Sequence, residues 1–182
     1  LTKGLQATGC DIVDIGLVPT PVLYFSLFHL NTDGGCMITA SHNPAEYNGI
    51  KLCLGKAALH GKDIQHIGHL AEHGPFAAGT SQRTEAEVID PYMAYITKQI
   101  RLRRPLRVVV DAGNGTSGLI IQDLLRRLGC EVYELFCEVD GTFPNHHPDP
   151  TVPENLTDII REVRARQADV GRHAALRVAG RH

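Results

Sequence analysis

Apolar residues in the first half of the 182-residue chain occur in two patterns, short continuous runs and repeats of three or four positions. The runs have the length of β-strands, which we therefore expect over 10–16, 34–41 and 48–54. The dipeptide at 48–49, Asn-Gly, predicts the turn between the last two strands. The repeats place apolar side chains on one face of a helix, and helices are expected over 1–9, 18–31 and 62–73.

The second half of the chain changes to the pattern of a parallel sheet. Residues 106–135 contain an apolar strand, a glycine-rich turn, a helical repeat and a second apolar strand. This order predicts a βαβ unit, whose two strands lie parallel in one sheet. Further elements are expected on both sides of this unit: a helix over about 85–101, a proline-rich loop over 138–153, a helix over 154–167 and a strand from 168.

A stretch rich in glycine, serine and alanine at 74–83 predicts a linker between the two patterns. The first domain is expected over residues 1–84 and the second over 85–182. Because strands and helices alternate in both, the predicted fold class is α/β, with two α/β domains that contain mixed sheets.

The amino-acid composition argues against nucleic-acid and membrane binding but does not indicate a particular function. Hydrophobic residues make up 43% and charged residues 21%, and the formal net charge is −2. This balance is typical of soluble globular proteins, and we expect no nucleic-acid or membrane partner. No leader is visible, although the chain begins at Leu1, which suggests a fragment or a processed product. The five widely spaced cysteines favour reduced thiols and a cytoplasmic location: Cys10, Cys36, Cys53, Cys130 and Cys137.

The stretch TASHNPAEYNGIK, residues 39–51, concentrates chemically active side chains on one irregular loop between two strands. Ser41 and His42 are adjacent, and Lys51 follows ten residues after the serine. Pro44 and Gly49 provide the backbone angles of a tight loop. From the spacing alone, Ser41 could carry a reacting group or simply hydrogen-bond its own turn.

This loop resembles the phosphoserine loop of the α-D-phosphohexomutases, and most closely that of bacterial phosphomannomutase/phosphoglucomutase. Three other stretches agree in the same order: VPTPVLYF (18–25), VVVDAGNG (108–115) and LGCEVYELFCEVDGTFPNHHPDPTVPENL (128–156). The resemblance covers residues 1 to about 171. It implies a partial copy of a four-domain phosphohexomutase, holding most of domains one and two.

The resemblance also implies an activity and residue roles. The family interconverts hexose 1-phosphate and hexose 6-phosphate, of mannose or glucose, through a phosphoserine and a bisphosphate intermediate. Ser41 would carry the catalytic phosphate, and Lys51 would transfer a proton. His42 and Asn43 would bind the phosphate or the hexose phosphate substrate. The family cofactor is Mg²⁺, to which Ser41 would contribute a ligand through its phosphate.

The sequence departs from this family at its C-terminal end. The family has an acidic metal loop, Asp-Gly-Asp-x-Asp-Arg, which would follow residues 168–171. Residues 172–182 instead read RHAALRVAGRH and contain no carboxylate. Mg²⁺ prefers oxygen ligands and would have a poor site here. We expect a frameshifted or truncated reading frame near residue 171, and no appreciable mutase turnover from the 182-residue chain alone.

The glycine-rich turn of the βαβ unit supports an alternative class. Gly113, Gly115 and Gly118 match G-x-G-x-x-G between a strand and a helix, with Glu134 about twenty residues after the turn. This pattern is typical of NAD-binding Rossmann-type domains. In the mutase resemblance the same turn is structural.

Two groups of histidines are candidates for metal sites. His66, His69 and His73 share one face of a predicted helix, which is more typical of a solvated surface than of a zinc site. His146 and His147 lie with Asp149 in the proline-rich loop, where a structural role is favoured over metal binding.

Overall fold

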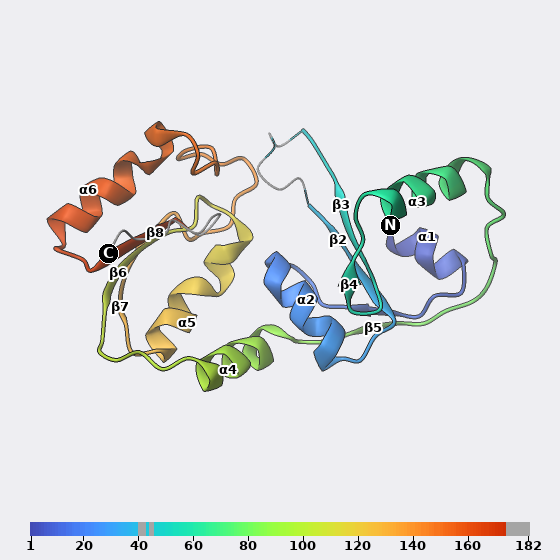
Figure 1. Cartoon of the computed structure of the whole chain (residues 1–182), viewed down its shortest axis with the longest axis horizontal. Coiled ribbons are helices and arrows are strands. Elements are labelled where there is room, and N and C mark those ends of the chain that lie inside the picture. Colours follow the sequence, from blue (N-terminus) through green and yellow to red (C-terminus); the bar gives the residue numbers. More distant parts are fainter. Residues whose placement is uncertain (40–42, 44–45, 174–182) are drawn as a thin grey trace. The chain divides into compact units, whose positions relative to one another are not determined.

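The computed structural model describes residues 1–39, Asn43 and 46–173. The chain divides into two compact units, of which the first comprises residues 1–38 and 50–88 and so ends a few residues beyond the boundary expected from the sequence. Both units combine helices with sheets (Figure 1), which confirms the predicted class of two α/β domains. Within the described residues, no helix is both long and apolar enough to cross a membrane.

The first unit contains two small sheets. Strands β1 (Ile12–Asp14) and β5 (Arg83–Glu85) pair in parallel, and β2 (Gly34–Ile38), β3 (Ile50–Leu54) and β4 (Ala57–Ala58) form an antiparallel sheet in that order. Three helices accompany these strands: α1 (Thr2–Ala7), α2 (Thr20–His29) and α3 (Lys62–His73). Gly9 has a φ of +87°, the left-handed angle expected of the residue that ends α1.

Helix α2 packs directly on one face of the antiparallel sheet because Gly35 has no side chain. A Cβ atom at Gly35 would lie 2.7 Å from Cδ2 of Leu27 and 3.2 Å from Cδ1 of Leu23. Both leucines are buried, as is Cys53, which pairs with Gly35 across β2 and β3. The core of this unit therefore lies between α2 and the sheet.

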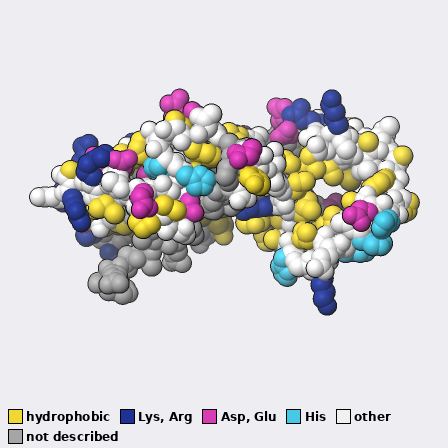
Figure 2. Space-filling model, turned by 90° about the horizontal axis from the view of Figure 1, so that it is seen from above, with side chains coloured by type: hydrophobic (Ala, Val, Ile, Leu, Met, Phe, Trp, Pro, Cys, Tyr) yellow, Lys and Arg dark blue, Asp and Glu magenta, His cyan; other side chains and the backbone are white. Residues whose placement is uncertain are grey.

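The opposite face of the same sheet is exposed in the described chain. Ile38 and Ile50 form a cross-strand pair and are 53% and 52% exposed, and Leu54 on the same face is 70% exposed. Hydrophobic side chains are accordingly visible at the surface in Figure 2. Packing on one face only is the arrangement that an antiparallel sheet tolerates.

The turn predicted at Asn48-Gly49 and the positive φ expected of Gly49 are both wrong. Asn48 and Gly49 do not form a two-residue hairpin turn, because the connection between β2 and β3 runs from residue 39 to residue 49. Gly49 also lacks the positive φ expected of it, and its missing side chain instead admits the carbonyl oxygen of Thr39, 2.9 Å from a Cβ position. The expected linker is followed at once by β5, whose register with β1 pairs Ile12 with Arg83.

The second unit is a parallel three-stranded sheet with helices on both faces. The strand order is β7 (Glu131–Leu135), β6 (Arg107–Asp111), β8 (Val170–His173), with parallel pairing throughout. The helical elements are α4 (Ile89–Gln99), the 3₁₀ turn η1 (Thr116–Leu119), α5 (Ile121–Arg127), the 3₁₀ turn η2 (Pro153–Leu156) and α6 (Thr157–Ala165). The predicted βαβ unit is β6, α5 and β7, with η1 added before the helix.

Alternate residues of β6 point to opposite faces, and both faces are covered. Val108 and Val110 pack with Ile121 and Leu125 of α5 in one apolar cluster. On the other face, α6 contacts β6 and β8, and a Cβ atom at Gly171 would lie 2.6 Å from the side chain of Val163. Burial on both faces explains why β6 is a continuous apolar run without alternation.

The start of β6 is held by Asp169, immediately before β8. Its carboxylate accepts a 2.7 Å bond from Arg104 Nη2 and another 2.7 Å bond from the backbone N–H of Arg107. These two interactions, the bond from Arg104 first, lower the pKa of Asp169 from its usual 3.8 to about 2. The charged carboxylate is therefore favoured in the folded chain.

We expect Asp169→Asn to destabilise the chain at neutral pH by an amount that disappears in acid. A carboxyl group whose pKa is lowered by folding stabilises the fold above its unfolded pKa, and this contribution is lost as the pH falls from about 4 through about 2. Urea unfolding of both proteins, followed by circular dichroism at several pH values, measures the difference. A difference that stays constant from pH 7 to pH 2 would contradict this explanation.

Candidate functional site

The serine loop, residues 39–49, connects the paired ends of β2 and β3. Ile38 faces Ile50 across the two strands, and the N–H of Thr39 donates to the carbonyl oxygen of Gly49 at 2.9 Å. The loop is therefore closed at its base by a continuation of the strand ladder. Ser41 and His42, the predicted phosphate carrier and its neighbour, lie outside the described residues.

Asn43 and Lys51, the other two predicted site residues, are described. Asn43 is exposed in a bend of the loop. Lys51 is the second residue of β3 and is half-buried. Its Nζ donates to Oγ1 of Thr20 at 3.5 Å, and the Thr20 hydroxyl lies 3.6 Å from Sδ of Met37, the cross-strand partner of Lys51. The lysine side chain thus lies on the face of the sheet that α2 covers.

The ammonium of Lys51 consequently lies beside the N-terminus of α2. Thr20 is the first residue of this helix, with Pro19 as its N-cap residue. The N-terminal end of a helix carries a partial positive charge and attracts anions. A lysine and a helix N-terminus that lie together in this way favour a negatively charged group such as a phosphate.

Backbone N–H groups of the glycine-rich turn after β6 are already hydrogen-bonded within the chain. The N–H of Gly113 donates to Oδ1 of Asp111, that of Asn114 to the carbonyl of Phe136 and that of Gly115 to the carbonyl of Ala112. A dinucleotide pyrophosphate is normally bound by such N–H groups at the start of a helix. Here they hold the turn itself.

Gly118 and Glu134, the other two residues of the dinucleotide pattern, also contact other residues of the chain. Gly118 lies against the carbonyl of Cys137, and the N–H of Gly118 donates to the carbonyl of Gly115. The carboxylate of Glu134 forms an ion pair with Arg126 of α5. The turn therefore has the structural role that the family resemblance implies.

The histidines of α3 lie on an exposed surface. His66, His69 and His73 are all exposed, and the rings of His69 and His73 are in edge contact at 4.9 Å between centroids. Among the described residues, the three do not converge as a group of potential metal ligands.

The proline-rich loop separates its two histidines. His147 is exposed and its ring contacts Phe143, whereas His146 is turned inward with Nε2 3.0 Å from Oδ2 of Asp111. Oδ1 of Asp149 accepts from the N–H and the hydroxyl of Thr151, so this carboxylate shapes a turn. The grouping of His146, His147 and Asp149 considered from the sequence is therefore not formed.

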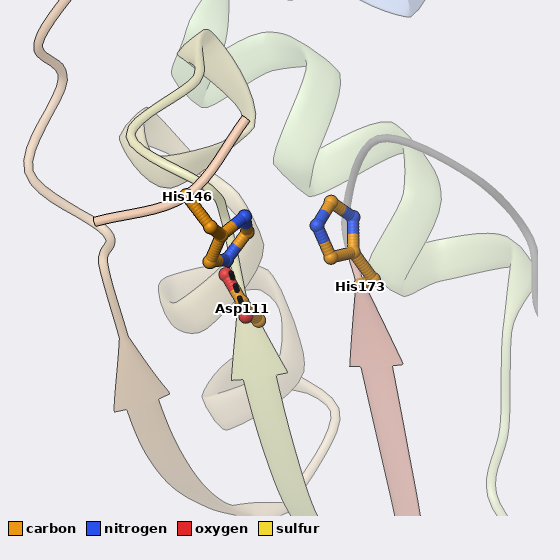
Figure 3. A group of neighbouring side chains, drawn as sticks. All are labelled: Asp111, His146 and His173. Atoms are coloured by element: carbon orange, nitrogen blue, oxygen red, sulfur yellow. Dashed lines mark hydrogen bonds and ion pairs between the residues drawn. The ribbon is translucent and has the colours of Figure 1, made fainter. Parts of the chain in front are cut away.

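A different group of potential ligands was not recognised from the sequence. Asp111, His146 and His173 each offer one atom, and these atoms lie within 4.8 Å of one another. Asp111 ends β6 and His173 ends β8, two neighbouring parallel strands (Figure 3). The sequence feature that could have indicated this group is the position of Asp111 and His173 at the ends of two strands. The carboxyl ends of parallel strands meet at one edge of a sheet.

These residues do not fit Mg²⁺, the cofactor that the family resemblance implies. Mg²⁺ requires oxygen ligands in octahedral geometry. The described group offers two imidazoles and one carboxylate, and residues 174–182 contain no carboxylate. We therefore derive no magnesium-dependent step from this chain.

Comparison with known proteins identifies the family of both units. The family model for phosphoglucomutase/phosphomannomutase, alpha/beta/alpha domain I, matches residues 1–77. The model for domain II of the same family matches residues 90–173. The two matches are consecutive, in the order of the two compact units, and together they cover most of the chain.

Curated relatives agree over almost the whole sequence. The chain is 44% identical over 171 residues to a phosphomannomutase/phosphoglucomutase of Pseudomonas aeruginosa, covering 94% of this chain and 37% of the relative. It is 43% identical over 173 residues to a phosphoglucomutase of Neisseria meningitidis, covering 94% of this chain and 38% of the relative. The chain therefore spans a little more than a third of the length of these relatives.

Solved structures show the same relationship in three dimensions. A phosphoglucomutase/phosphomannomutase family protein from Burkholderia thailandensis superposes with a TM-score of 0.87 at 44% identity, over 93% of this chain and 39% of that one. The class of protein is thus that of the α-D-phosphohexomutases, with two of their α/β domains present. The chain belongs to the phosphoglucomutase/phosphomannomutase family.

Proposed function

We propose that this chain is the phosphoserine-bearing part of a cytoplasmic mutase that exchanges hexose 1-phosphate and hexose 6-phosphate, with mannose or glucose as the sugar. The observation that carries the proposal is the hairpin of β2 and β3, which joins the serine loop to Lys51. Ser41 follows Ile38, the last residue of β2, by three positions in the sequence. Lys51 follows Ile50, the partner of Ile38.

The proposed chemistry is a two-step relay of one phosphoryl group. The bond between Oγ of Ser41 and phosphorus breaks while a hydroxyl oxygen of the hexose phosphate forms a bond to the same phosphorus. The product is a hexose bisphosphate and a free serine. After the sugar has turned round, its other phosphate returns to Ser41, and the isomeric hexose monophosphate is released.

Positioning and charge neutralisation are the main requirements of phosphoryl transfer. In the first step the attacking hydroxyl must lose its proton, which we assign to the neutral amine of Lys51, while the leaving Oγ of Ser41 takes a proton from water. In the second step Ser41 gives its hydroxyl proton back to water as it accepts the phosphoryl group, and Lys51 returns its proton to the sugar oxygen. His42 and Asn43 are proposed to bind the phosphate. The proposed contribution of this chain to Mg²⁺ binding is one ligand, the phosphate on Ser41.

Replacing Lys51 with methionine is expected to reduce mutase turnover by about 10²- to 10⁴-fold in a full-length protein containing this sequence. General acid–base groups typically contribute this much, and methionine retains the aliphatic stem without the amine. Turnover is measured with glucose 1-phosphate in a coupled assay. The matched control is Lys62→Met at the exposed start of α3, for which wild-type turnover is expected. Near-normal turnover of Lys51→Met would exclude the proton-transfer role.

Phosphate mapping tests the proposal directly. The full-length protein is incubated with a hexose 1,6-bisphosphate, and its peptides are analysed by mass spectrometry. One phosphoryl group is expected on Ser41. Reproducible labelling at another residue, or none, would overturn the proposal.

A further inference from the structure

The group formed by Asp111, His146 and His173 lies within the second unit and takes no part in the proposed phosphate relay. We propose that these three side chains bind a divalent transition-metal ion of borderline softness, with Zn²⁺ as the representative, at the carboxyl ends of β6 and β8. This site has a different donor set from the acidic magnesium loop of the family. The inference does not depend on the proposed function.

The three potential ligand atoms are close to the spacing that one ion requires. Zn²⁺ binds imidazole nitrogen and carboxylate oxygen at about 2.0–2.2 Å, which places two ligand atoms of a tetrahedral ion about 3.3 Å apart. Nε2 of His146 and Oδ2 of Asp111 are already 3.0 Å apart. All three ligand atoms lie within 4.8 Å of one another, so the largest separation would have to shorten for one ion to bind all three.

Each of the first two ligands is oriented by a backbone group. Oδ1 of Asp111 accepts from the N–H of Gly113 at 2.8 Å, which leaves Oδ2 directed toward His146. Nδ1 of His146 lies 3.0 Å from the carbonyl oxygen of His147. In the tautomer with the ring proton on Nδ1, this carbonyl oxygen accepts the ring N–H. A histidine ligand of a metal commonly donates its second ring N–H in this way.

Nε2 of His146 and Oδ2 of Asp111 face each other at 3.0 Å (Figure 3). In the tautomer with the ring proton on Nδ1, Nε2 offers a lone pair to a metal ion, as Oδ2 of the carboxylate does.

His173 brings a third potential ligand to His146 and Asp111. The rings of His146 and His173 are 5.4 Å apart between centroids. A Cβ atom at Gly113 would lie 3.3 Å from Cε1 of His146 and 3.6 Å from Cε1 of His173, so both rings have an edge at the same point of the turn. A ring proton can join only two of these groups, whereas a metal ion can bind all three.

The burial of the group raises the electrostatic benefit of a bound ion. The side chain of Asp111 is 0% exposed and that of His146 is 9% exposed, and His173 is 1% exposed as a residue. A buried carboxylate is costly unless its charge is compensated. A divalent ion bound by one carboxylate and two imidazoles compensates that charge and retains an open position for water or another ligand.

The donor types select the metal. Two imidazoles and one carboxylate suit Zn²⁺ and similar ions, whereas Mg²⁺ and Ca²⁺ require mainly oxygen. Cys137 does not belong to the group, whose three ligand atoms come from Asp111, His146 and His173.

Metal titration of the full 182-residue chain tests this site. The exposed histidines of α3 are a competing site of two ligands, so the reference protein carries His69→Gln and His73→Gln. Zn²⁺ binding is measured by calorimetry after chelator treatment, and Co²⁺ binding by the visible bands of the four-coordinate ion. We expect one equivalent of either metal to bind the reference protein, and no comparable binding of Mg²⁺.

Single variants identify the ligands. Asp111→Asn, His146→Gln and His173→Gln, each in the reference background, are expected to weaken binding by at least about 100-fold. The matched control is His147→Gln, an exposed neighbour that should bind as the reference does. Circular dichroism without metal establishes that each variant is folded. Equal affinity in the three variants and the control, or no binding by the reference protein, would overturn the proposal.

A measurement on the reference protein alone covers the case in which a variant does not fold. Zn²⁺ is expected to shift the imidazole ¹⁵N resonances of two histidines, which assignment places at His146 and His173. Shifts confined to other histidines, or no shift at His146 and His173 on addition of Zn²⁺, would overturn the proposal.

Discussion

Replacing Ser41 with alanine is expected to remove nearly all mutase turnover from a full-length protein that contains this sequence. Alanine has no oxygen to accept a phosphoryl group, so the relay cannot start and no other side chain can replace the covalent step. We expect a loss of at least about 10⁴-fold in turnover with glucose 1-phosphate. The same variant should show no phosphopeptide after incubation with a hexose bisphosphate.

A second serine provides the control for this experiment. Ser81 lies in the first unit and donates to the carbonyl of Gln6 at 3.3 Å, well separated in sequence from the serine loop. Ser81→Ala removes a hydroxyl of the same kind and should retain both turnover and labelling. Retention of normal turnover by Ser41→Ala would refute the assignment of the phosphate carrier.

The largest expected effect on stability comes from Gly118→Ala in the second unit. A Cβ atom at Gly118 would lie 2.1 Å from the carbonyl oxygen and 2.8 Å from the carbonyl carbon of Cys137. Both are backbone atoms, so no side-chain rotation relieves the overlap. The free energy of unfolding is expected to fall by about 3 kcal/mol or more, because the chain after β7 must move away from η1.

Gly141→Ala is the matched control, since no atom lies within 4 Å of a Cβ position at that glycine. It should change the free energy of unfolding by less than about 0.5 kcal/mol. The chain contains no tryptophan, so urea unfolding is followed by circular dichroism. Equal unfolding midpoints for the two variants would contradict the close contact between Gly118 and Cys137.

The parts of the fold that were predictable from the sequence depend on local pattern. The continuous apolar run of β6 and the helical repeat of α5 predicted the βαβ unit correctly. The helix expected over 62–73 is α3, and its histidines are exposed as expected of a solvated face. In each case the element is determined by residues close together in the sequence, so a short stretch of sequence is enough to predict it.

The elements that were missed form only through partners far along the chain. Strand β5, Arg83–Glu85, contains no apolar run, and it is a strand because β1 lies beside it. Asn48-Gly49 is common in tight hairpin turns, but the pairing of Ile38 with Ile50 leaves a much longer connection here. Local propensity was therefore overridden by long-range pairing.

The sequence by itself determined the two α/β domains, the family and the candidate serine loop, because these follow from short patterns and motifs along the chain. The tertiary structure alone decided which chemical groups meet. It placed Lys51 beside Thr20, and it brought Asp111, His146 and His173 together from two strand ends and a loop. The physical reason is that neighbouring parallel strands end at the same edge of a sheet, so side chains more than sixty residues apart in sequence become neighbours there.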